Sequence, residues 1–437
     1  MEYAASRPLL TLQSSFIDWE NAVILGHPTY PFHRNCVPDK ALAPLPPSEL
    51  HRLTNPTVAI LLVPRSDICV YGEIENLLEP LLESFGTSSS APAGHIYIPY
   101  LAEQVPAILE AFPLARVIKS VPDRSRSQSS LRTVTITDYK LDLKFSVAYR
   151  IGSQYRQFGR PSVSVGLGWA KILRKIVPEN LWLFDELAGV AGDDQKMDYH
   201  SSCRLACVLR ENSTARADVN DEALIVWAAL MEKPYCDDRT YAEILFHLDT
   251  KGKKVEWFTS YIKCLMELVL HPLLHYGVAL EAHAQNMIAR FSRSTGDITG
   301  FAYRDMGGVR GHAPTLQKLG LLTESINPTC KDDMAYFLDR LHQTLIQNIG
   351  YLLYTLGLED IDNGTDVWGI VRFVLSDTLD ADNNIFGGQV YKHLTEQKMP
   401  LNCYLGRRMA SSFRSRPTQG AEHLKREVPN HIAGTSA

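Results

Sequence analysis

The chain has 437 residues, of which 45% are hydrophobic and 21% are charged, with a formal net charge of −5 and a pI near 6.3. This composition is ordinary for a globular protein with a large core. The slightly acidic balance excludes a global basic field for nucleic acid or anionic lipid, so the positive charge for an anionic ligand must be local. No run reaches the roughly 18 apolar residues of a membrane span, and residues 1–13 do not form a secretory signal. We therefore expect a cytoplasmic protein with no nucleic-acid or membrane partner.

The first part of the chain is rich in predicted strands. Proline-rich residues 38–56 are typical of a surface loop. Apolar runs predict strands at 58–63 and 95–99, on either side of a Ser/Pro/Gly-rich linker. β-Branched residues at 132–138 and strict alternation at 142–151 predict two more strands, joined as a hairpin around residues 138–140.

From about residue 160 the apolar pattern becomes helical. Spacing of three to four predicts helices at 163–177, 222–231, 257–290 and 334–358. The polar tail after Pro417 is expected to fray. The sequence thus predicts an α+β protein with a β-rich lobe (1–215), a helical lobe (216–415) and a polar tail (416–437). Its eight scattered cysteines are too sparse for a disulfide framework and predict free thiols.

Two polar clusters in the β-rich part stand out. Prolines stiffen the segment 26–34, which presents His27, His33 and Arg34; a loop with incidental histidines is the simpler alternative. In Ser130-Leu131-Arg132-Thr133, two hydroxyls flank a guanidinium, a combination that suits a phosphate group. The alternative there is an exposed loop after the charged residues 124–127.

A further pair of cations lies within the alternating strands. Lys144 is on the face opposite Leu143 and Phe145, and Arg156 follows a break at Gly152-Ser153. Alternation alone favours a solvated Lys144, but two cations separated by a strand and a turn can also bracket one anion.

Two more clusters occur in the helical part. Glu281, His283, Gln285 and Asn286 interrupt an apolar segment; on a helix, Glu281 and Gln285 would share one face and His283 and Asn286 another. Buried polar groups need partners, so this segment is either a structural network or a ligand or metal site. Arg304-Asp305 before Gly307-Gly308 suits a loop that approaches a ligand, although such turns are also common elsewhere.

The glycine pair Gly166-Leu167-Gly168 has no nucleotide-binding interpretation. It lacks the third glycine and the following acidic residue of a dinucleotide fingerprint.

Taken together and in this order, the clusters resemble the motifs of the NRPS-independent siderophore synthetases of the aerobactin-synthetase (IucA/IucC) type. The matching segments are Gly26-His27-Pro28, Ser130-Leu131-Arg132-Thr133, Lys144 with Arg156, Glu281 to Asn286, and Arg304-Asp305 with Gly308. They span residues 20 to about 308, and a weaker helical similarity continues to about residue 410. Each motif alone is unspecific, whereas five in the same order are strongly specific.

The resemblance implies a cupped-hand synthetase fold, with an ATP cleft between the β-rich, nucleotide-binding lobe and the helical lobe. It also implies a ligase of siderophore or related secondary metabolism. Such an enzyme converts a citrate-like polycarboxylic acid with ATP to an acyl-adenylate, and then joins it to an amine with release of AMP. Homodimers are usual in the family, so a homodimer is possible here.

The resemblance also implies roles for single residues. Lys144, Arg156 and His283 would be catalytic, with Arg156 and His283 on the substrate carboxylate. Mg²⁺, which prefers a few protein oxygens plus phosphates, would be held by Glu281, Asn286 and Asp305. The residues expected to bind ATP are His27, Ser130, Arg132, Thr133, Lys144 and Gln285.

This chain departs from the family pattern in its first motif and in its length. Tyr30 replaces the second motif histidine and Arg34 replaces a lysine, which keeps the charge and changes the geometry. Family members also carry a lobe before this motif. The chain is therefore expected to be a short form, to have its site completed by another protein, or to be a truncated version of a longer chain. A non-catalytic descendant that binds a nucleotide, a polycarboxylate or a partner synthetase is therefore the main alternative. An unrelated helical scaffold is the third.

Overall fold

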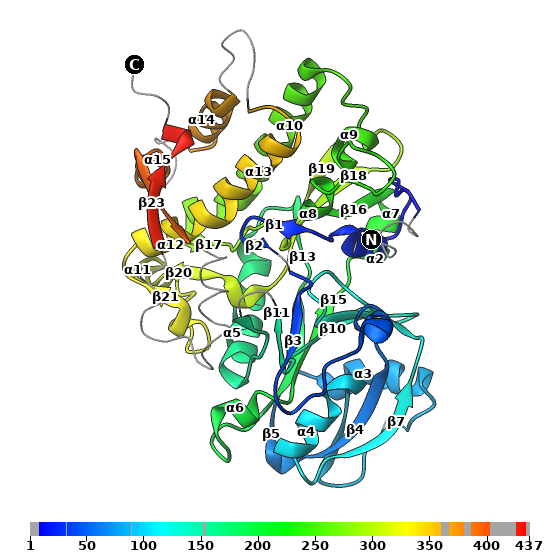
Figure 1. Ribbon diagram of the computed structural model, residues 1–437. Helices are drawn as coiled ribbons and strands as arrows, with labels where there is room; N and C mark the ends of the chain where they lie inside the picture. Colours follow the sequence, from blue (N-terminus) through cyan, green and yellow to red (C-terminus); the bar gives the residue numbers. More distant parts are fainter. Residues whose placement is uncertain are drawn as a thin grey trace. The chain divides into compact units, whose positions relative to one another are not determined.

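The computed structural model describes residues 8–31, 33–88, 90–151, 154–359, 367–379, 386–402 and 425–433 (Figure 1). The chain divides into two compact units, each built from separate stretches of sequence. Residues 32–171 and 184–212 form one, here called the sheet unit; residues 1–31, 172–183 and 213–437 form the other, here called the helical unit. The units are thus discontinuous, whereas the sequence suggested continuous lobes, because the chain passes between the two units several times.

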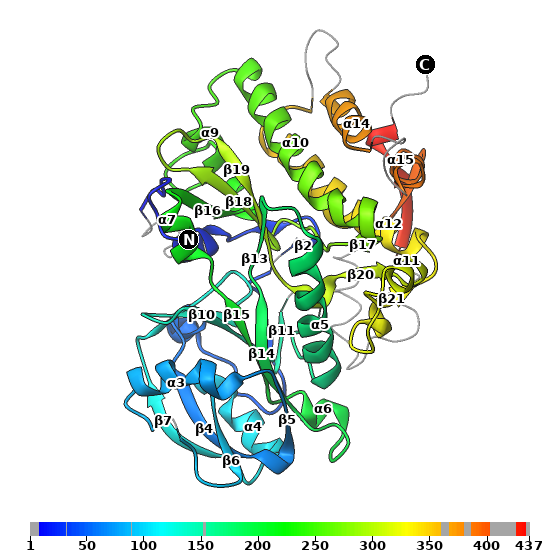
Figure 2. The same ribbon diagram turned by 180° about the vertical axis from the view of Figure 1, so that it is seen from behind.

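The sheet unit contains two antiparallel sheets around one core. The larger has the strand order β5-β14-β15-β10-β9-β8 and the smaller the order β6-β4-β7. The strands of the larger sheet are β5 (Ile68–Tyr71), β8 (Ser125–Ser127), β9 (Thr133–Ile136), β10 (Leu141–Phe145), β14 (Glu186–Gly192) and β15 (Ala206–Glu211). Those of the smaller sheet are β4 (Val58–Pro64), β6 (His95–Leu101) and β7 (Arg116–Val121), accompanied by helices α3 (Ile74–Ser84) and α4 (Val105–Ala111) (Figure 2).

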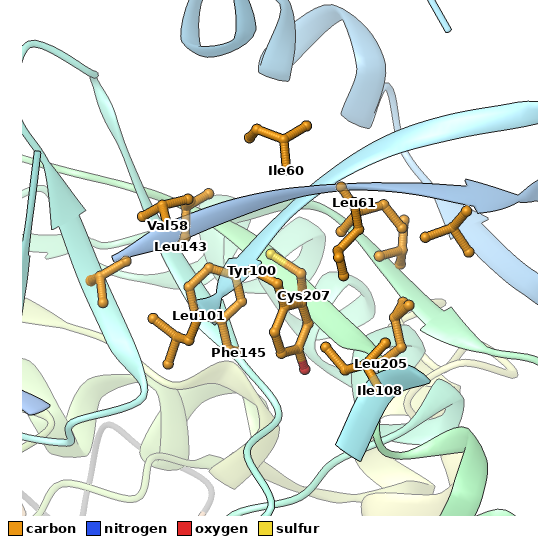
Figure 3. Packing of buried hydrophobic residues seen from close by; sticks show 14 of the residues in the cluster. Val58, Ile60, Leu61, Tyr100, Leu101, Ile108, Leu143, Phe145, Leu205 and Cys207 are labelled. Atoms are coloured by element: carbon orange, nitrogen blue, oxygen red, sulfur yellow. The ribbon is translucent and has the colours of Figure 1, made fainter. Parts of the chain in front are cut away.

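The core lies between the apolar faces of these two sheets. Figure 3 shows Tyr100 from the smaller sheet near Phe145 and Cys207 from the larger, with Ile60 on the opposite side of β4. The ring centroids of Tyr100 and Phe145 are 4.8 Å apart. Burial of these apolar faces is the main favourable term that fixes the strand register.

One face of the larger sheet forms the core described above, and its other face, here called the second face, carries many polar side chains. Helix α5 (Arg160–Ile176) covers part of it, with Val163 and Leu167 packed on Val208 in a small apolar cluster. Strand residues that alternate with the core positions, such as Lys144, therefore face this second side. The three-stranded ribbon β12-β11-β3 completes the described strands of the unit, with bounds Gln154–Tyr155, Tyr149–Ile151 and Cys36–Pro38.

The helical unit contains a four-stranded sheet with the order β13-β19-β18-β16. Its strands are β13 (Leu181–Leu183), β16 (Glu222–Val226), β18 (Met287–Ser292) and β19 (Ile298–Tyr303). Helices near it are α2 (Phe16–Ala22), α7 (Thr214–Val219), α8 (Trp227–Leu230) and α9 (Tyr241–Leu245), and α2 follows the hydroxyl cap of Ser15. A second, three-stranded sheet consists of β17 (Val278–Ala279), β20 (Arg310–His312) and β21 (Cys330–Lys331).

Long helices form the rest of the helical unit. Helix α10 (Lys251–Tyr276) packs on α14 (Val367–Thr378), as Figures 1 and 2 both show. A continuous helical run consists of α12 (Ala335–Leu341), the π-helical turn η6 (His342–Ile346) and α13 (Gln347–Thr355). The remaining helices are α11 (Ala313–Lys318) and α15 (Gly387–Leu394). None of the helices in the described ranges combines the length and apolar character that a bilayer crossing requires.

Most predicted elements are confirmed, and the predictions of two helices are wrong. Residues 58–63, 95–99 and the hairpin around 138–140 have the predicted strands, and 163–177 and 334–358 are helical. The helix predicted at 257–290 ends at Tyr276, because Gly277 adopts a left-handed conformation (φ 66°) and the chain turns into β17. Residues 222–226 are strand β16 rather than helix, because they pair with β18 in a buried sheet.

The expectation of a frayed tail is also wrong for residues 425–433. They form β23 (Lys425–Pro429), which pairs with β22 (Lys398–Asn402), and the turn η8 (His431–Ala433). Ile432 is fully buried, and the amide of Asn430 donates to the carbonyls of Leu394 and Glu396. These contacts hold residues 425–433 in a regular structure although the composition of the tail is polar. The described cysteines are free thiols, and Cys403 lies outside the described residues.

Candidate active site

In the sheet unit, the hydroxyls and the arginine of the Ser-x-Arg-Thr motif lie at a turn between β8 and β9. The turn is closed by the Leu131 amide, which donates to the Gln128 carbonyl at 2.9 Å, and Leu131 has a positive φ of 60°. The Ser130 hydroxyl donates to Thr133 Oγ1 at 3.3 Å. The motif is therefore an ordered turn and not the loose exposed loop that was its alternative.

A buried polar network holds the base of this turn. The Asp142 carboxylate accepts from Gln128 Nε2 at 2.6 Å and from Arg210 Nη2 at 3.0 Å. Its other oxygen accepts from Thr135 and Asn212, at 2.9 and 3.1 Å. Asp142 and Arg210 are 0% and 3% exposed, so each charge is paired as burial requires.

Lys144 lies on the same face of the sheet, two residues along β10 from Asp142. Its cross-strand neighbours are Thr133 on β9 and Val208 on β15. Only 9% of its side chain is exposed, and Nζ donates to Glu186 Oε1 at 2.9 Å. The solvated Lys144 that alternation favoured is therefore wrong, because the second face of this sheet is covered.

Two cations of this face share one aromatic ring. Arg132 and Lys144 lie 5.6 and 5.9 Å from the centroid of the Phe158 ring, within range of a cation–π attraction. The structure thus brings Ser130, Arg132, Thr133 and Lys144 together: two hydroxyls and two cations on one side of one sheet.

The backbone of Arg156 is hydrogen-bonded on both sides within the same unit. Its amide donates to the Tyr149 carbonyl at 3.0 Å, and its carbonyl accepts from the Val147 amide at 3.1 Å. This pairing fixes the position at which the residue leaves the ribbon β11–β12. The preceding break at Gly152-Ser153 lies outside the described residues.

In the helical unit, the first histidine motif is a small hairpin of β1 (Gly26–His27) and β2 (Tyr30–Pro31). Glu232 anchors its entry, because Oε1 accepts from three consecutive amides, Ile24, Leu25 and Gly26, at 2.8, 2.7 and 3.2 Å. His27 is 3% exposed, and its Nδ1 is 2.8 Å from the Thr29 hydroxyl. The position of His27 is thus set by a glutamate 205 residues further along the chain, which the sequence does not indicate.

The second histidine motif is a tight turn between β17 and β18, so the helical faces proposed for residues 281–286 are wrong. The strand pairings of β17 and β18 leave no room for a helix in between. The turn places the His283 ring on the His27 ring, with centroids 5.0 Å apart and planes at 26°. The Gln285 amide donates to His283 Nδ1 at 3.2 Å, so a neutral His283 carries its proton on Nε2, where it is a donor.

Carboxylates and amides of the same motif are held by local contacts. The Asn286 amide Nδ2 donates to the Glu281 carbonyl at 3.1 Å. The Glu281 carboxylate forms an ion pair with Arg340 of α12 and lies against Gly308, where a Cβ would overlap it. The segment 281–286 therefore contains a structural network, one of its two proposed interpretations, which does not exclude a ligand.

The Arg-Asp motif has one buried member, Arg304, and one half-buried member, Asp305. Arg304 is 3% exposed, with Nη1 2.6 Å from Glu20 Oε1 and Nε donating to the Gln285 carbonyl at 2.9 Å. Asp305 adopts a positive φ of 72° at the start of the turn η4 (Met306–Gly308). For a non-glycine residue this conformation is uncommon and occurs often at functional sites.

Tyr303 connects these two motifs. Its hydroxyl accepts from the Glu281 amide at 3.3 Å and donates to the Asp305 carbonyl at 3.2 Å. Burial, and then the charges of Glu281 and Asp305, raise the pKa of Tyr303 well above its usual value. It therefore stays protonated and keeps both roles. Sequence reasoning missed Tyr303, Glu186, Glu232 and Arg340; only Tyr303, which adjoins the Arg-Asp motif, carried a signal.

Several side chains of the helical unit carry oxygen atoms of the kind that bind Mg²⁺. Glu281, Asn286 and Asp305 offer carboxylate and amide oxygens, and Mg²⁺ is bound in proteins by few such groups together with phosphates. Among the described residues, no three or more His, Cys, Asp or Glu side chains form a ready metal cluster. The donor set therefore fits a metal that arrives with a phosphate ligand better than a resident one.

The hydroxyls and clustered cations of the sheet unit are groups that bind nucleotide phosphates, which makes the protein a candidate nucleotide-dependent enzyme. The IucA / IucC family model matches residues 110–232, and the model described as "Ferric iron reductase FhuF-like transporter" matches residues 255–411. The first match covers the motif turn and the polar sheet face, and the second covers the second histidine motif and the Arg-Asp motif.

Two curated relatives cover nearly the whole chain, and a third covers about half of it. The NRPS-independent siderophore synthetase-like protein ankE of Aspergillus thermomutatus is 36% identical over 94% of this chain and 69% of its own length. The NRPS-independent siderophore synthetase rfs of Rhizopus delemar is 28% identical over 98% and 68%. The D-ornithine–citrate ligase of Staphylococcus aureus is 24% identical over 54% and 40%. The chain therefore belongs to the NRPS-independent siderophore synthetase family, which eliminates the unrelated helical scaffold.

Solved structures have the same fold. The petrobactin biosynthesis protein AsbB of Bacillus anthracis superposes with a TM-score of 0.77 at 18% identity, over 98% of this chain and 76% of that chain. The ATP-bound aerobactin synthetase IucA of Klebsiella pneumoniae gives 0.72 at 16% identity, over 96% and 77%. The predicted α+β synthetase fold is thus confirmed.

Proposed function

We propose that this protein is an ATP-dependent ligase that activates a citrate-like polycarboxylic acid and joins it to an amine. The observation that carries the proposal is the gathering of Ser130, Arg132, Thr133 and Lys144 on one covered sheet face. A buried lysine and a half-buried arginine beside hydroxyls suit a polyphosphate far better than they suit solvent. Family membership supports it, and so does the D-ornithine–citrate ligase, whose name pairs citrate with an amine.

The reaction has two half-reactions. A carboxylate oxygen of the acid attacks the α-phosphorus of ATP, the bond to the β-phosphate oxygen breaks, and pyrophosphate leaves. The amine then attacks the acyl carbon, the bond to the AMP oxygen breaks, and the amine loses a proton as the amide forms. Attack of one anion on another requires fixed cations at the developing charge.

The residues of the sheet unit take the phosphate roles. Ser130, Arg132 and Thr133 bind the triphosphate, and Lys144 binds the phosphate nearest the reaction. Arg156 neutralises the incoming carboxylate and the α-phosphate. A guanidinium fits both groups because it donates two parallel hydrogen bonds.

Residues of the helical unit are assigned roles in the same reaction. His283 donates from Nε2 to a phosphate or carboxylate oxygen, as its Nδ1 hydrogen bond directs. His27 stacks on it and supports its orientation, and Gln285 contributes to ATP binding. Mg²⁺ arriving with ATP would be held by Glu281, Asn286 and Asp305, and would supply charge neutralisation at the phosphates.

The decisive experiment measures pyrophosphate release from ATP and Mg²⁺ with a panel of acids: citrate, malate, 2-oxoglutarate, aspartate and glutamate. Hydroxylamine serves as the amine trap. We expect release that depends on one acid and that Lys144→Met abolishes, whereas Lys140→Met, at an exposed position of the neighbouring hairpin turn, leaves it unchanged. No release with any acid from folded protein would favour the non-catalytic binding protein instead.

A further inference from the structure

A buried carboxylate lies beside the cation that the proposed reaction needs most. Glu186 is the first residue of β14 and is 2% exposed, and its Oε1 accepts from Lys144 Nζ at 2.9 Å. A negative charge next to a phosphate site repels the phosphate. Its presence there calls for a physical reason.

The geometry of the sheet shows how the carboxylate reaches Lys144. Glu186 is opposite Arg210 on β15, Arg210 is opposite Asp142 on β10, and Lys144 is two residues further along β10. The side chain of Glu186 therefore crosses β15 diagonally to reach Nζ. The pairing register shifts between Glu186 and Ala188, a bulge that re-aims the side chain at this point.

Helix α5 leaves room for this carboxylate at one residue. A Cβ at position 166 would overlap Glu186 Oε2, and its next neighbour would be the carboxyl carbon of Glu186 at 3.3 Å. The atoms in the way are the end of a flexible side chain, so a larger residue at 166 would displace the carboxylate rather than the backbone. The sequence indicated no nucleotide-binding role for Gly166. The structure shows that a glycine at this position leaves space for the Glu186 carboxylate.

We infer that Glu186 is a positioning residue for Lys144, and that Gly166 provides the space in which its carboxylate does so. An ammonium group has three N–H bonds on a flexible stem. The Glu186 carboxylate, held in place by the sheet, fixes the direction of one N–H bond of Lys144 and thereby restricts the directions of the other two. The side chain is pre-organised toward the phosphate, which reduces the cost of ordering it when the ligand binds.

This inference rests on the proposed function, and it predicts an effect opposite in sign to simple electrostatics. If Glu186 acted only by its charge, Glu186→Gln would remove a repulsion and tighten ATP binding. If Glu186 positions Lys144, the substitution weakens ATP binding, because the amide accepts more weakly and leaves Lys144 less constrained.

The test is isothermal titration of ATP with Mg²⁺ into the full chain, for variants shown to be folded by circular dichroism. We expect Glu186→Gln to weaken binding about 10-fold, since misplaced binding groups cost affinity on this scale. Gly166→Ala should weaken it in the same direction. Gly252→Ala is the matched control, because it is also a helical glycine and a Cβ there meets no atom within 4 Å; it should bind like the wild type.

A double-mutant cycle shows whether Glu186 acts through Lys144. In a Lys144→Met background, Glu186→Gln should weaken ATP binding no further. A further loss there would overturn the inference, and so would unchanged or tighter binding by the single variant Glu186→Gln.

Pyrophosphate release by the wild type separates this inference from the proposed function. Wild-type protein that binds ATP without releasing pyrophosphate would refute the ligase, while the binding data still decide the role of Glu186. An active wild type with unaffected variants would refute the role of Glu186 alone. A wild type that binds no ATP would refute both.

Discussion

At the scale of single residues, the structure separates polar groups that pack from polar groups that face a ligand. Arg304 is conspicuous in the sequence, yet it is buried and pairs with Glu20, so it holds two motif loops together. Lys144 looked like a surface residue, yet it is buried in an ion pair. Residue type alone did not distinguish the two, because alternation along a strand gives a side chain's face but not what covers that face.

The first prediction concerns Arg156. If its guanidinium neutralises the attacking carboxylate and the α-phosphate, Arg156→Ala should lower kcat/KM for the acid by ~10²-fold or more. Steady-state pyrophosphate release measures it, with the exposed Arg116→Ala as the control. A folded variant with unchanged turnover would refute the role.

At the scale of elements, the helical run α12–η6–α13 links the candidate site to the C-terminal strand. Arg340 at the end of α12 pairs with Glu281 of the motif turn, and Asp339 pairs with His393 of α15. The π-helical turn buries His342, whose Nε2 is 3.2 Å from Asn430 Oδ1 after β23. π-Helical turns within α-helices are rare and occur frequently at functional sites.

The second prediction is acid sensitivity at this turn. Burial lowers the pKa of His342 to about 4, from an ordinary value near 6.5. Between these values the unfolded state binds the extra proton, so the stability from the neutral ring is present above pH 6.5 and is lost as pH falls toward 4. The loss is on the order of 3 kcal/mol.

Urea denaturation between pH 7 and pH 4.5 checks this prediction. The midpoint of the wild type should fall more steeply with pH than that of His342→Gln, with His51→Gln, an exposed histidine, as the control. Parallel curves for wild type and His342→Gln would contradict it. The ion pair with Asp339 raises the pKa of His393, so its contribution has the opposite sign and is lost as pH rises.

The third prediction concerns the end of α10. Gly277 and Gly357 both have a φ of 66°, but a Cβ at 277 lies 3.0 Å from the Cβ of His312, whereas one at 357 meets nothing within 4 Å. Gly357→Ala should therefore cost only the left-handed conformation, about 1 kcal/mol. Gly277→Ala should cost more, because α10 must end where β17 begins. If both variants lost the same free energy of unfolding in thermal denaturation, the close contact at position 277 would be relieved at no cost, contrary to this prediction.

At the scale of the whole molecule, the chain places candidate phosphate groups in the sheet unit and candidate metal and histidine groups in the helical unit. Each unit has its own buried core and its own polar network. The chain passes between the units several times, so the motifs of one sequence are distributed over both. A ligand that binds the folded protein and not the unfolded chain stabilises the folded state.

The fourth prediction is therefore a stabilisation by ATP that depends on Mg²⁺. At an ATP concentration 100 times its Kd, binding should add about 2.7 kcal/mol to the free energy of unfolding and raise the melting temperature. Differential scanning fluorimetry measures the shift, and EDTA should remove most of it if the metal joins ATP to Glu281, Asn286 and Asp305. A shift of the same size in EDTA would refute these metal ligands.

The sequence by itself determined the fold class, the family and most strands. Alternating and apolar runs such as 58–63 and 142–145 carry their structure locally, because burial of one face is encoded in the periodicity. Five ordered motifs named most of the candidate groups, because the types of side chain that neutralise phosphate are few.

The tertiary structure alone decided which of those groups are buried, paired and oriented. Glu186 meets Lys144 across an intervening strand, and Glu232 anchors a loop more than 200 residues away in sequence. Residues 281–286 form a turn although their pattern is compatible with a helix, since the pairing of β17 and β18 overrides local preference. Such contacts depend on non-local packing, and no periodicity within one segment encodes them.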